Sequence, residues 1–187
     1  STHMTTQVFR NGKIYQQEYE IGKPLYSVKE VGTADITGTR QQFWPDGTIF
    51  TETVYDYKIL ASRLRELAYL NAGLRISLTD RRVVNEDGSF KSEQFYSEEG
   101  LREFVRFIES SREHLINDVI YLNSEKQGIP IEVAIMYNTG FSENVHSYVN
   151  NINTIEGGTH LAGFRRALTR TLKKYAEDSK MLETVSY

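Results

Sequence analysis

The pair Asn11-Gly12, which lies between two stretches of strand-forming residues, constrains the fold of this chain more than any other feature. A two-residue hairpin turn needs a positive φ at both positions, and Asn-Gly is the sequence that supplies it most readily. The pair predicts a β-hairpin over residues 8–15. Residues 38–44 are a further strand candidate, closed by the turn sequence of residues 45–47. The first part of the chain is therefore expected to be an antiparallel sheet.

A helix and a second group of strand signals follow. The sequence predicts a helix from its N-cap Asp56 to about Asn71, with Gly73 as its C-terminal stop. Apolar and polar side chains then alternate over residues 74–79, as in a half-buried strand, and residues 85–89 are a polar turn. The apolar stripe of the helix consists of Leu60, Leu64, Leu67 and Leu70.

A new series of helix and strand signals begins at Ser97, where we place a domain boundary. Ser97 is expected to cap a helix whose apolar face runs from residue 101 to residue 108. Residues 129–136 and 145–152 are predicted strands, and a last long helix is expected to begin with Thr159 as its cap. That helix is expected to bury Leu161, Phe164, Leu168, Leu172 and Tyr175. This order of elements predicts an α+β fold of mostly antiparallel strands with helices on one face.

Composition excludes some kinds of chemistry. The 187 residues include no cysteine, which excludes disulfides, thiolate zinc sites and a cysteine nucleophile, and fits a cytoplasmic location. The net charge of −3 argues against a chain that is basic all over but leaves room for a local basic face. No apolar run is long enough to span a membrane. Residues 1–4 are expected to derive from an expression vector, so that His3 carries no function.

Three sequence blocks together resemble one protein family. Residues 148–160, Tyr-Val-Asn-Asn-Ile-Asn-Thr-Ile-Glu-Gly-Gly-Thr-His, continue through residue 170 in a run that is similar to the signature of type IIA topoisomerase B subunits. Residues 38–45 resemble a late strand of the family's ATPase domain, and residues 59–68 resemble the helix after it. The resemblance covers residues 8–178 in the family's order and is closer to the gyrases than to topoisomerase IV.

The resemblance implies a fold and a function. Residues 5–97 correspond to the C-terminal part of a GHKL-type ATPase domain, and residues 98–187 to the first part of a transducer domain that is similar to domain 2 of ribosomal protein S5. In the family, ATP closes two B subunits into a gate, and the transducer relays that closure to the DNA-cleaving core, which supercoils DNA negatively. The implied cofactors are ATP and Mg²⁺. The implied partners are a second B subunit, the gyrase A subunit and double-stranded DNA.

The family's ATP-hydrolysing motifs have no counterpart in this chain, so we expect it to bind no cofactor and hydrolyse no ATP by itself. Glu113 and Asn117 do fit the family's Glu-x-x-x-Asn spacing for a base and a metal ligand on one helical face. However, no Asp-x-Gly-x-Gly follows them, and the resemblance places them in a loop. We therefore expect a solvated helix end or loop at this position.

Two residues match positions near the nucleotide in the family. Thr39 corresponds to a threonine that hydrogen-bonds near the adenine, although a threonine in a strand also needs no function. Arg10 corresponds to an arginine at the mouth of the nucleotide pocket, where coumarin inhibitors also bind. An arginine beside a turn is equally well explained by solvation. Both roles are expected only in a complete subunit.

Five basic residues recur at helical spacing in the last helix, opposite its apolar stripe. They are Arg165, Arg166, Arg170, Lys173 and Lys174. In the family this domain helps to line a cavity for the transported DNA, and such a stripe attracts phosphates without reading bases. A solvated helix face with favourable cations near its C-terminus is the alternative.

The remaining motifs favour structural roles. Residues 157–159, Gly-Gly-Thr before a helix, lack the lysine of a P-loop and are expected to form a tight turn. Gly163 is expected to allow close packing on a sheet, and His146 to be a core or interface histidine. His114, His146 and His160 do not have metal-site spacing.

Three alternative functions remain open from the sequence. They are a topoisomerase IV B-type subunit, a self-sufficient nucleotide-binding enzyme and a plain DNA-binding module. The absence of phosphate-handling motifs argues against the second, and the absence of a groove-reading motif argues against the third. We also expect residues 8–14 to lie at an exposed sheet edge that invites pairing between chains.

Overall fold

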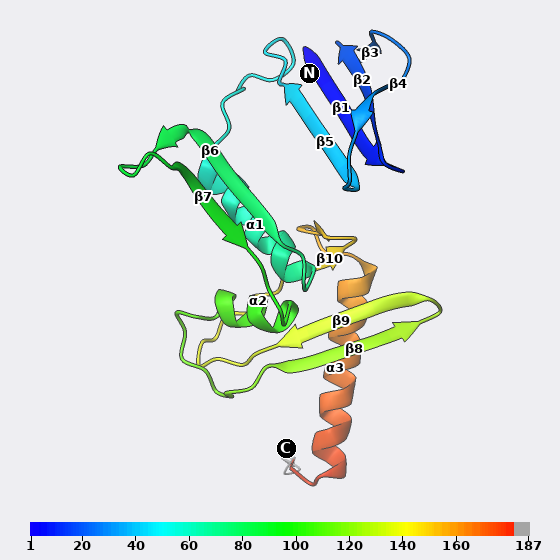
Figure 1. Cartoon of the computed structure of the whole chain (residues 1–187). Coiled ribbons are helices and arrows are strands. Elements are labelled where there is room, and N and C mark those ends of the chain that lie inside the picture. The colour runs from blue at the N-terminus through cyan, green and yellow to red at the C-terminus, as the bar shows by residue number, and fades with distance from the viewer. Residues whose placement is uncertain (182–187) are drawn as a thin grey trace. The chain divides into compact units, whose positions relative to one another are not determined.

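A computed structural model describes residues 1–181 and divides the chain into two compact units, Ser1–Lys58 and Ile59–Tyr187. The described residues have the α+β fold that the sequence predicts, with three helices and antiparallel strands (Figure 1). The boundary between residues 58 and 59 separates the two compact units. The boundary between residues 97 and 98, which the family resemblance places between the ATPase and transducer domains, is a different division and stays a prediction.

The first unit is an antiparallel sheet. Its strands are β1 (His3–Arg10), β2 (Lys13–Glu20), β3 (Lys23–Pro24), β4 (Lys29–Thr33) and β5 (Gly38–Trp44). The order is β3-β2-β1-β5, and β4 also pairs with β2 (Figure 1). The expectation that residues 8–14 form the exposed edge is wrong, because β1 pairs with β2 on one side and with β5 on the other. Among the described residues, β5 pairs with β1 alone and is the open edge.

The predicted turn between β1 and β2 is confirmed. Asn11 has φ 53° and Gly12 has φ 74°, the left-handed pair that a two-residue hairpin with matching twist requires. Two consecutive residues with positive φ also occur at positions 21–22 and 127–128, where glycine again takes the second position. A β-branched side chain at positive φ is unusual, yet Ile21 has φ 48°.

The second unit takes in helix α1 (Tyr57–Leu70) from Ile59 onward and the hairpin β6 (Ile76–Val84) and β7 (Phe90–Phe95). The Asp56 carboxylate accepts a hydrogen bond from the Lys58 N–H at 2.7 Å, as expected for a capping residue. Gly73 ends the helix with φ 85°, and its N–H bonds the Ser97 carbonyl. The helix, its cap and its stop therefore follow the sequence prediction.

Helix α2 (Leu101–Ile108) begins three residues later than a direct cap by Ser97 would place it, because its N-cap is Gly100. Ser97 is almost fully buried, and its hydroxyl accepts the Gly100 N–H at 2.8 Å. The Glu103 carboxylate accepts the N–H groups of Glu98 and Glu99, and these bonds, the one from Glu99 first, hold its pKa below the usual range. Ser97 therefore shapes the loop that leads into the helix instead of capping its first turn.

The last elements are the hairpin β8 (Ile120–Lys126) and β9 (Ile129–Ile135), the short strands β10 (Tyr148–Val149) and β11 (Ile152–Asn153), and helix α3 (Thr159–Asp178) (Figure 1). The single strand predicted over residues 145–152 is wrong. Asn150 and Asn151 have φ 50° and 65°, and they form a turn because asparagine tolerates the left-handed region.

The core lies within the second unit. Its buried apolar residues are Ala61, Ala68, Phe95, Phe104 and Val119. The Tyr69 ring of α1 stacks on the Phe104 ring of α2, with ring centres 5.2 Å apart. Burial raises the pKa of Tyr69. The core therefore joins α1, the β6–β7 hairpin and α2.

Helix α3 differs from its prediction. None of its residues is fully buried, and Leu172 and Tyr175 are exposed. Its N-cap is Gly158, without a side-chain hydrogen bond, so Thr159 does not cap it. The expected close packing of Gly163 is also wrong, because a Cβ added there would meet open space.

Candidate nucleic-acid interface

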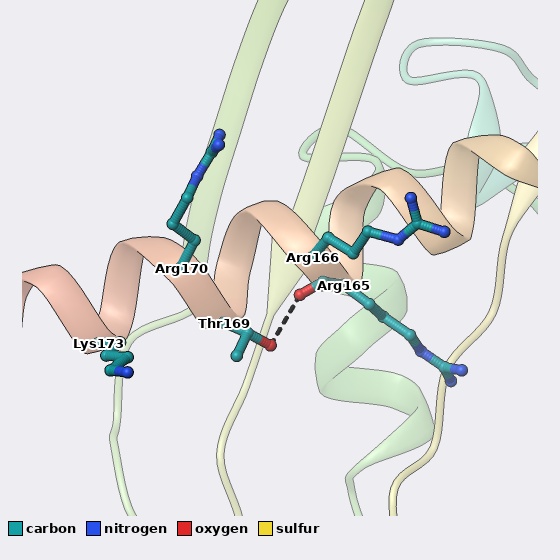
Figure 2. A pocket seen from close by; sticks show the side chains of 5 residues that line it. All are labelled: Arg165, Arg166, Thr169, Arg170 and Lys173. Atoms are coloured by element: carbon teal, nitrogen blue, oxygen red, sulfur yellow. Dashed lines mark hydrogen bonds between the residues drawn. The ribbon is translucent and has the colours of Figure 1, made fainter.

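The basic side chains of α3 are exposed and spread over a broad face of the helix, with Arg170 on one side of the ribbon and Arg165 and Lys173 on the other (Figure 2). An open depression of about 430 Å³ is lined by Arg165, Arg166, Thr169, Arg170 and Lys173. Lys174 is also exposed but does not line the depression. The Thr169 hydroxyl donates to the Arg165 carbonyl one turn earlier at 2.9 Å, so it is occupied within the helix. The structure thus brings four of the five predicted basic residues together around one depression.

Few of these cations have a carboxylate partner. Arg165 pairs with Glu143 at 3.0 Å, and Lys173 pairs with Glu177 at 4.0 Å; all four side chains are more than half exposed. Exposed pairs of this kind contribute about 0–1 kcal/mol and exchange readily for other anions. Within residues 1–181, Arg166 and Arg170 have no ion-pair partner. The depression therefore presents guanidinium groups whose planar forks match phosphate oxygens.

Arg10 and Thr39 lie on the same face of the first unit's sheet. Val8 of β1 is directly opposite Thr39 of β5, and Arg10 is two residues from Val8. Opposed residues share a face and alternate residues of a strand share a face, so the two side chains are diagonal neighbours, about 7–8 Å apart at their Cα atoms. Both are exposed. The sheet brings them together as a pair that a ligand on this face could contact.

Glu113 and Asn117 lie outside the helices, in the loop between α2 and β8. The helical face on which the two would act together does not form, which confirms the loop interpretation. His146 is exposed, and its ring bonds the Asn144 side chain at 3.1 Å, so the core interpretation is wrong. Within residues 1–181, no group of three or more metal-binding side chains comes together.

Sequence reasoning missed a second set of polar residues. Asn151, in the turn between β10 and β11, bonds Arg63 of α1 and Asn71, the residue directly after α1, across 80 or more residues of sequence. The Asn150-Asn151 pair was a signal for the turn. Nothing in the sequence pattern indicated its partners on α1.

Comparison with known proteins gives a consistent result. A family model described as DNA gyrase B matches residues 100–186. The B subunit of DNA gyrase from Cytophaga hutchinsonii is 59% identical over 183 residues, and that from Chitinophaga japonensis is 51% identical over 187 residues. Each alignment covers 98% of this chain, but the chain spans only 38% and 39% of the length of these relatives.

Two solved structures share the fold. The 43K ATPase domain of Thermus thermophilus gyrase B, crystallised with an aminocoumarin, matches with a TM-score of 0.82 at 30% identity, over 100% of this chain and 50% of that chain. The B subunit of Myxococcus xanthus DNA gyrase matches with a TM-score of 0.82 at 22% identity, over 95% of this chain and 51% of that chain, which shows the fold alone.

The curated relatives, the family model and the 30%-identical gyrase B structure together place the chain in the B-subunit class of type II topoisomerases. Within that class, the chain belongs to the DNA gyrase B family. The topoisomerase IV alternative is not favoured, because the curated relatives named above are gyrase subunits. None of the helices in residues 1–181 combines the length and apolar content needed to cross a membrane.

Proposed function

We propose that this chain is the coupling portion of a gyrase B subunit, which carries ATP-driven gate closure to DNA strand passage. In the complete enzyme it works with a second B subunit, the A subunit and double-stranded DNA, in the cytoplasm, and the net result is negative supercoiling. Membership of the gyrase B family and the likeness to a 43K ATPase domain support this proposal. Residues 5–97 then belong to the GHKL ATPase domain and residues 98–187 to the S5-like transducer.

The exposed basic side of α3 is the observation that carries the DNA part of the proposal. Arg166 and Arg170 have no carboxylate partner within the described residues, and Arg165 and Lys173 have only exposed ones. We assign phosphate contacts with duplex DNA to these four residues and Lys174. Such contacts hold a DNA segment without reading its sequence, which suits an enzyme that passes any duplex.

The test is duplex binding over a range of salt concentrations, by fluorescence anisotropy. Replacing Arg166, Arg170 and Lys173 together by Ala removes up to three phosphate contacts. The slope of log affinity against log salt should become shallower by about 2–3, since each contact contributes about 0.9.

The matched control replaces Lys23, Lys58 and Lys126, three exposed lysines outside α3, and changes net charge by the same amount. It should leave the slope close to wild type. Equal slopes for both triple variants would remove DNA contact from α3.

Nucleotide binding is the second part. In the complete subunit, we assign Arg10 and Thr39 to the ATP side of the domain, with Mg²⁺ held by residues of the complete ATPase site. The isolated chain lacks the family's catalytic motifs and should not hydrolyse ATP. Calorimetric titration with Mg²⁺ and a non-hydrolysable ATP analogue should show no binding at millimolar nucleotide. Saturable micromolar binding would instead favour a self-sufficient nucleotide site.

A further inference from the structure

The turn between β10 and β11 is bonded to a helix that is distant in sequence. The Arg63 guanidinium donates to the Asn151 carbonyl at 2.7 Å, and the Asn151 amide donates to the Asn71 side-chain oxygen at 3.0 Å. We call Arg63, Asn71 and Asn151 the polar clamp. Both ends of the Asn71 amide are used, because its nitrogen donates to the Leu67 carbonyl at 2.8 Å. The clamp therefore fixes the turn to the middle of α1 and to the residue that directly follows the helix.

A second set of contacts supports the clamp. Glu66 of α1 pairs with Arg63 and accepts a hydrogen bond from the Tyr148 hydroxyl. Burial, with the Glu66 carboxylate second, raises the pKa of Tyr148 well above its usual range, so its hydroxyl stays a donor. The Tyr148 ring centre lies 6.3 Å from that of Phe104. The β10–β11 hairpin is thus held by charge-assisted bonds and by the aromatic core.

The clamp has a particular place in the chain. The boundary between the two compact units falls within α1, after Lys58. At the other end, five residues separate β11 from α3. Within that linker the Thr154 N–H bonds the Ser147 carbonyl and the Gly157 N–H bonds the Thr154 carbonyl, both at 2.8 Å. The clamp therefore connects the helix at the unit boundary to the base of the basic helix.

We propose that Arg63, Asn71 and Asn151 are positioning residues that transmit displacement of α1 to α3. This inference rests on the coupling function proposed above. A displacement of α1 carries the β10–β11 turn with it, because the turn is bonded at two points. The short linker then moves the base of α3, and with it the cations that face DNA. Loss of the clamp leaves each part folded but weakens the mechanical connection between them.

The first experiment uses this chain and hydrogen–deuterium exchange. Asn151→Gly keeps a residue that adopts positive φ and removes the amide that bonds Asn71. Asn71→Ala removes the other partner. Exchange of the Thr154 and Gly157 amides should become about fivefold faster in each variant, the equivalent of one net hydrogen bond. The double variant should add little to either single one, because the two changes remove the same bond.

Asn150→Gly is the matched control. Asn150 lies in the same turn at positive φ, but the bonds to α1 come from its neighbour. In Asn150→Gly, exchange of the Thr154 and Gly157 amides should stay within about twofold of wild type, since a Gly at positive φ is well tolerated. Equal acceleration in Asn150→Gly and Asn151→Gly would overturn the clamp, because the turn alone would then account for the effect.

The second experiment places the same variants in the complete B subunit, assembled with the A subunit, and measures ATP hydrolysis and supercoiling together. Asn151→Gly and Asn71→Ala should keep their ATPase rate, while the supercoils introduced per ATP fall about tenfold, within the usual range of coupling energies. An unchanged ratio, or an equal loss of both activities, would overturn the positioning role. If the wild-type assembly showed no ATP-dependent supercoiling, the proposed function itself would fail.

Discussion

Helices α1 and α3 have similar sequence patterns and opposite environments. Each has an apolar stripe and several arginines, yet α1 buries Ala61 and Ala68, while no residue of α3 is fully buried. The arginines differ in the same way. Arg63 and Arg65 make long-range contacts within the fold, whereas Arg166 and Arg170 face solvent. Amphipathic spacing shows which face of a helix can be buried, but it does not show whether another element covers that face.

The difference also separates two uses of arginine. On α1 the guanidinium groups hold neighbouring elements in place, so their loss should lower stability. On α3 they are available to an outside anion, so their loss should change binding and leave stability unchanged. The following substitutions test this distinction, beginning with the largest expected effect.

The largest effect on the free energy of unfolding is expected in the core around α1. Phe104→Ala removes a ring that stacks on Tyr69 and is only 7% exposed, and it should lower the free energy of unfolding by about 3–5 kcal/mol. Leu172→Ala on α3, where the side chain is 50% exposed, should cost less than about 1 kcal/mol. Urea denaturation followed by circular dichroism measures both. Similar costs would mean that α3 is packed in solution.

Enlarging an alanine on each helix gives an intermediate effect. Ala68 is 2% exposed, so Ala68→Leu should overpack α1 and destabilise the fold by about 1–3 kcal/mol. Ala167→Leu places the same side chain at an exposed position of α3 and should change stability by less than about 0.5 kcal/mol. Thermal unfolding of the two variants provides the comparison. A neutral Ala68→Leu would contradict the close packing around α1.

Removing one arginine from each helix should separate their roles. The Arg65 guanidinium pairs with Glu93 at 3.2 Å and lies 5.2 Å from the centre of the Phe95 ring. Because this side chain is partly exposed, Arg65→Ala should cost only about 0.5–1 kcal/mol. Arg170→Ala should leave the urea midpoint unchanged and weaken duplex binding instead. A stability loss in Arg170→Ala would place that residue among the structural arginines.

The smallest effect is a pH dependence in the β6–β7 hairpin. Hydrogen bonds from the Arg82 side chain and backbone to the Asp80 carboxylate hold the pKa of that carboxyl at about 2, below its ordinary value of 3.8. The stabilisation is therefore present above pH 4 and is lost as the pH falls towards 2. Asp80→Asn should show a shallower decline of melting temperature between pH 4 and pH 2. An identical decline in both proteins would assign the acid sensitivity to other carboxyl groups.

Local features were the part of the fold that the sequence predicted well. The Asn11-Gly12 turn, the α1 helix with its cap and stop, and the alternating strand from Ile129 all form where expected. Each depends on backbone conformations that a few adjacent residues decide. Predictions that needed a neighbour from elsewhere in the chain were less successful. The buried stripe of α3 and the core position of His146 were both wrong for this reason.

The candidate sites also divide into features that adjacent residues set and features that depend on distant parts of the chain. The sequence identified the basic residues of α3 because helical spacing alone places them on one broad face. It paired Arg10 with Thr39 only through the family resemblance, and the strand register then put them on one face. It did not identify Arg63 and Asn71 as partners of Asn151, because hydrogen bonds across 80 or more residues leave no periodic signal.

The sequence by itself determined the Asn11-Gly12 turn, both ends of α1, the strand alternation from Ile129 and the family, because each is written in contiguous residues. Only the tertiary structure decided which apolar faces are covered, which arginines are held within the fold and which remain exposed. It also decided that the Asn150-Asn151 turn is bonded to α1. The physical reason is that burial and long-range hydrogen bonds belong to pairs of segments, and the free energy of a pair depends on where the fold places both members.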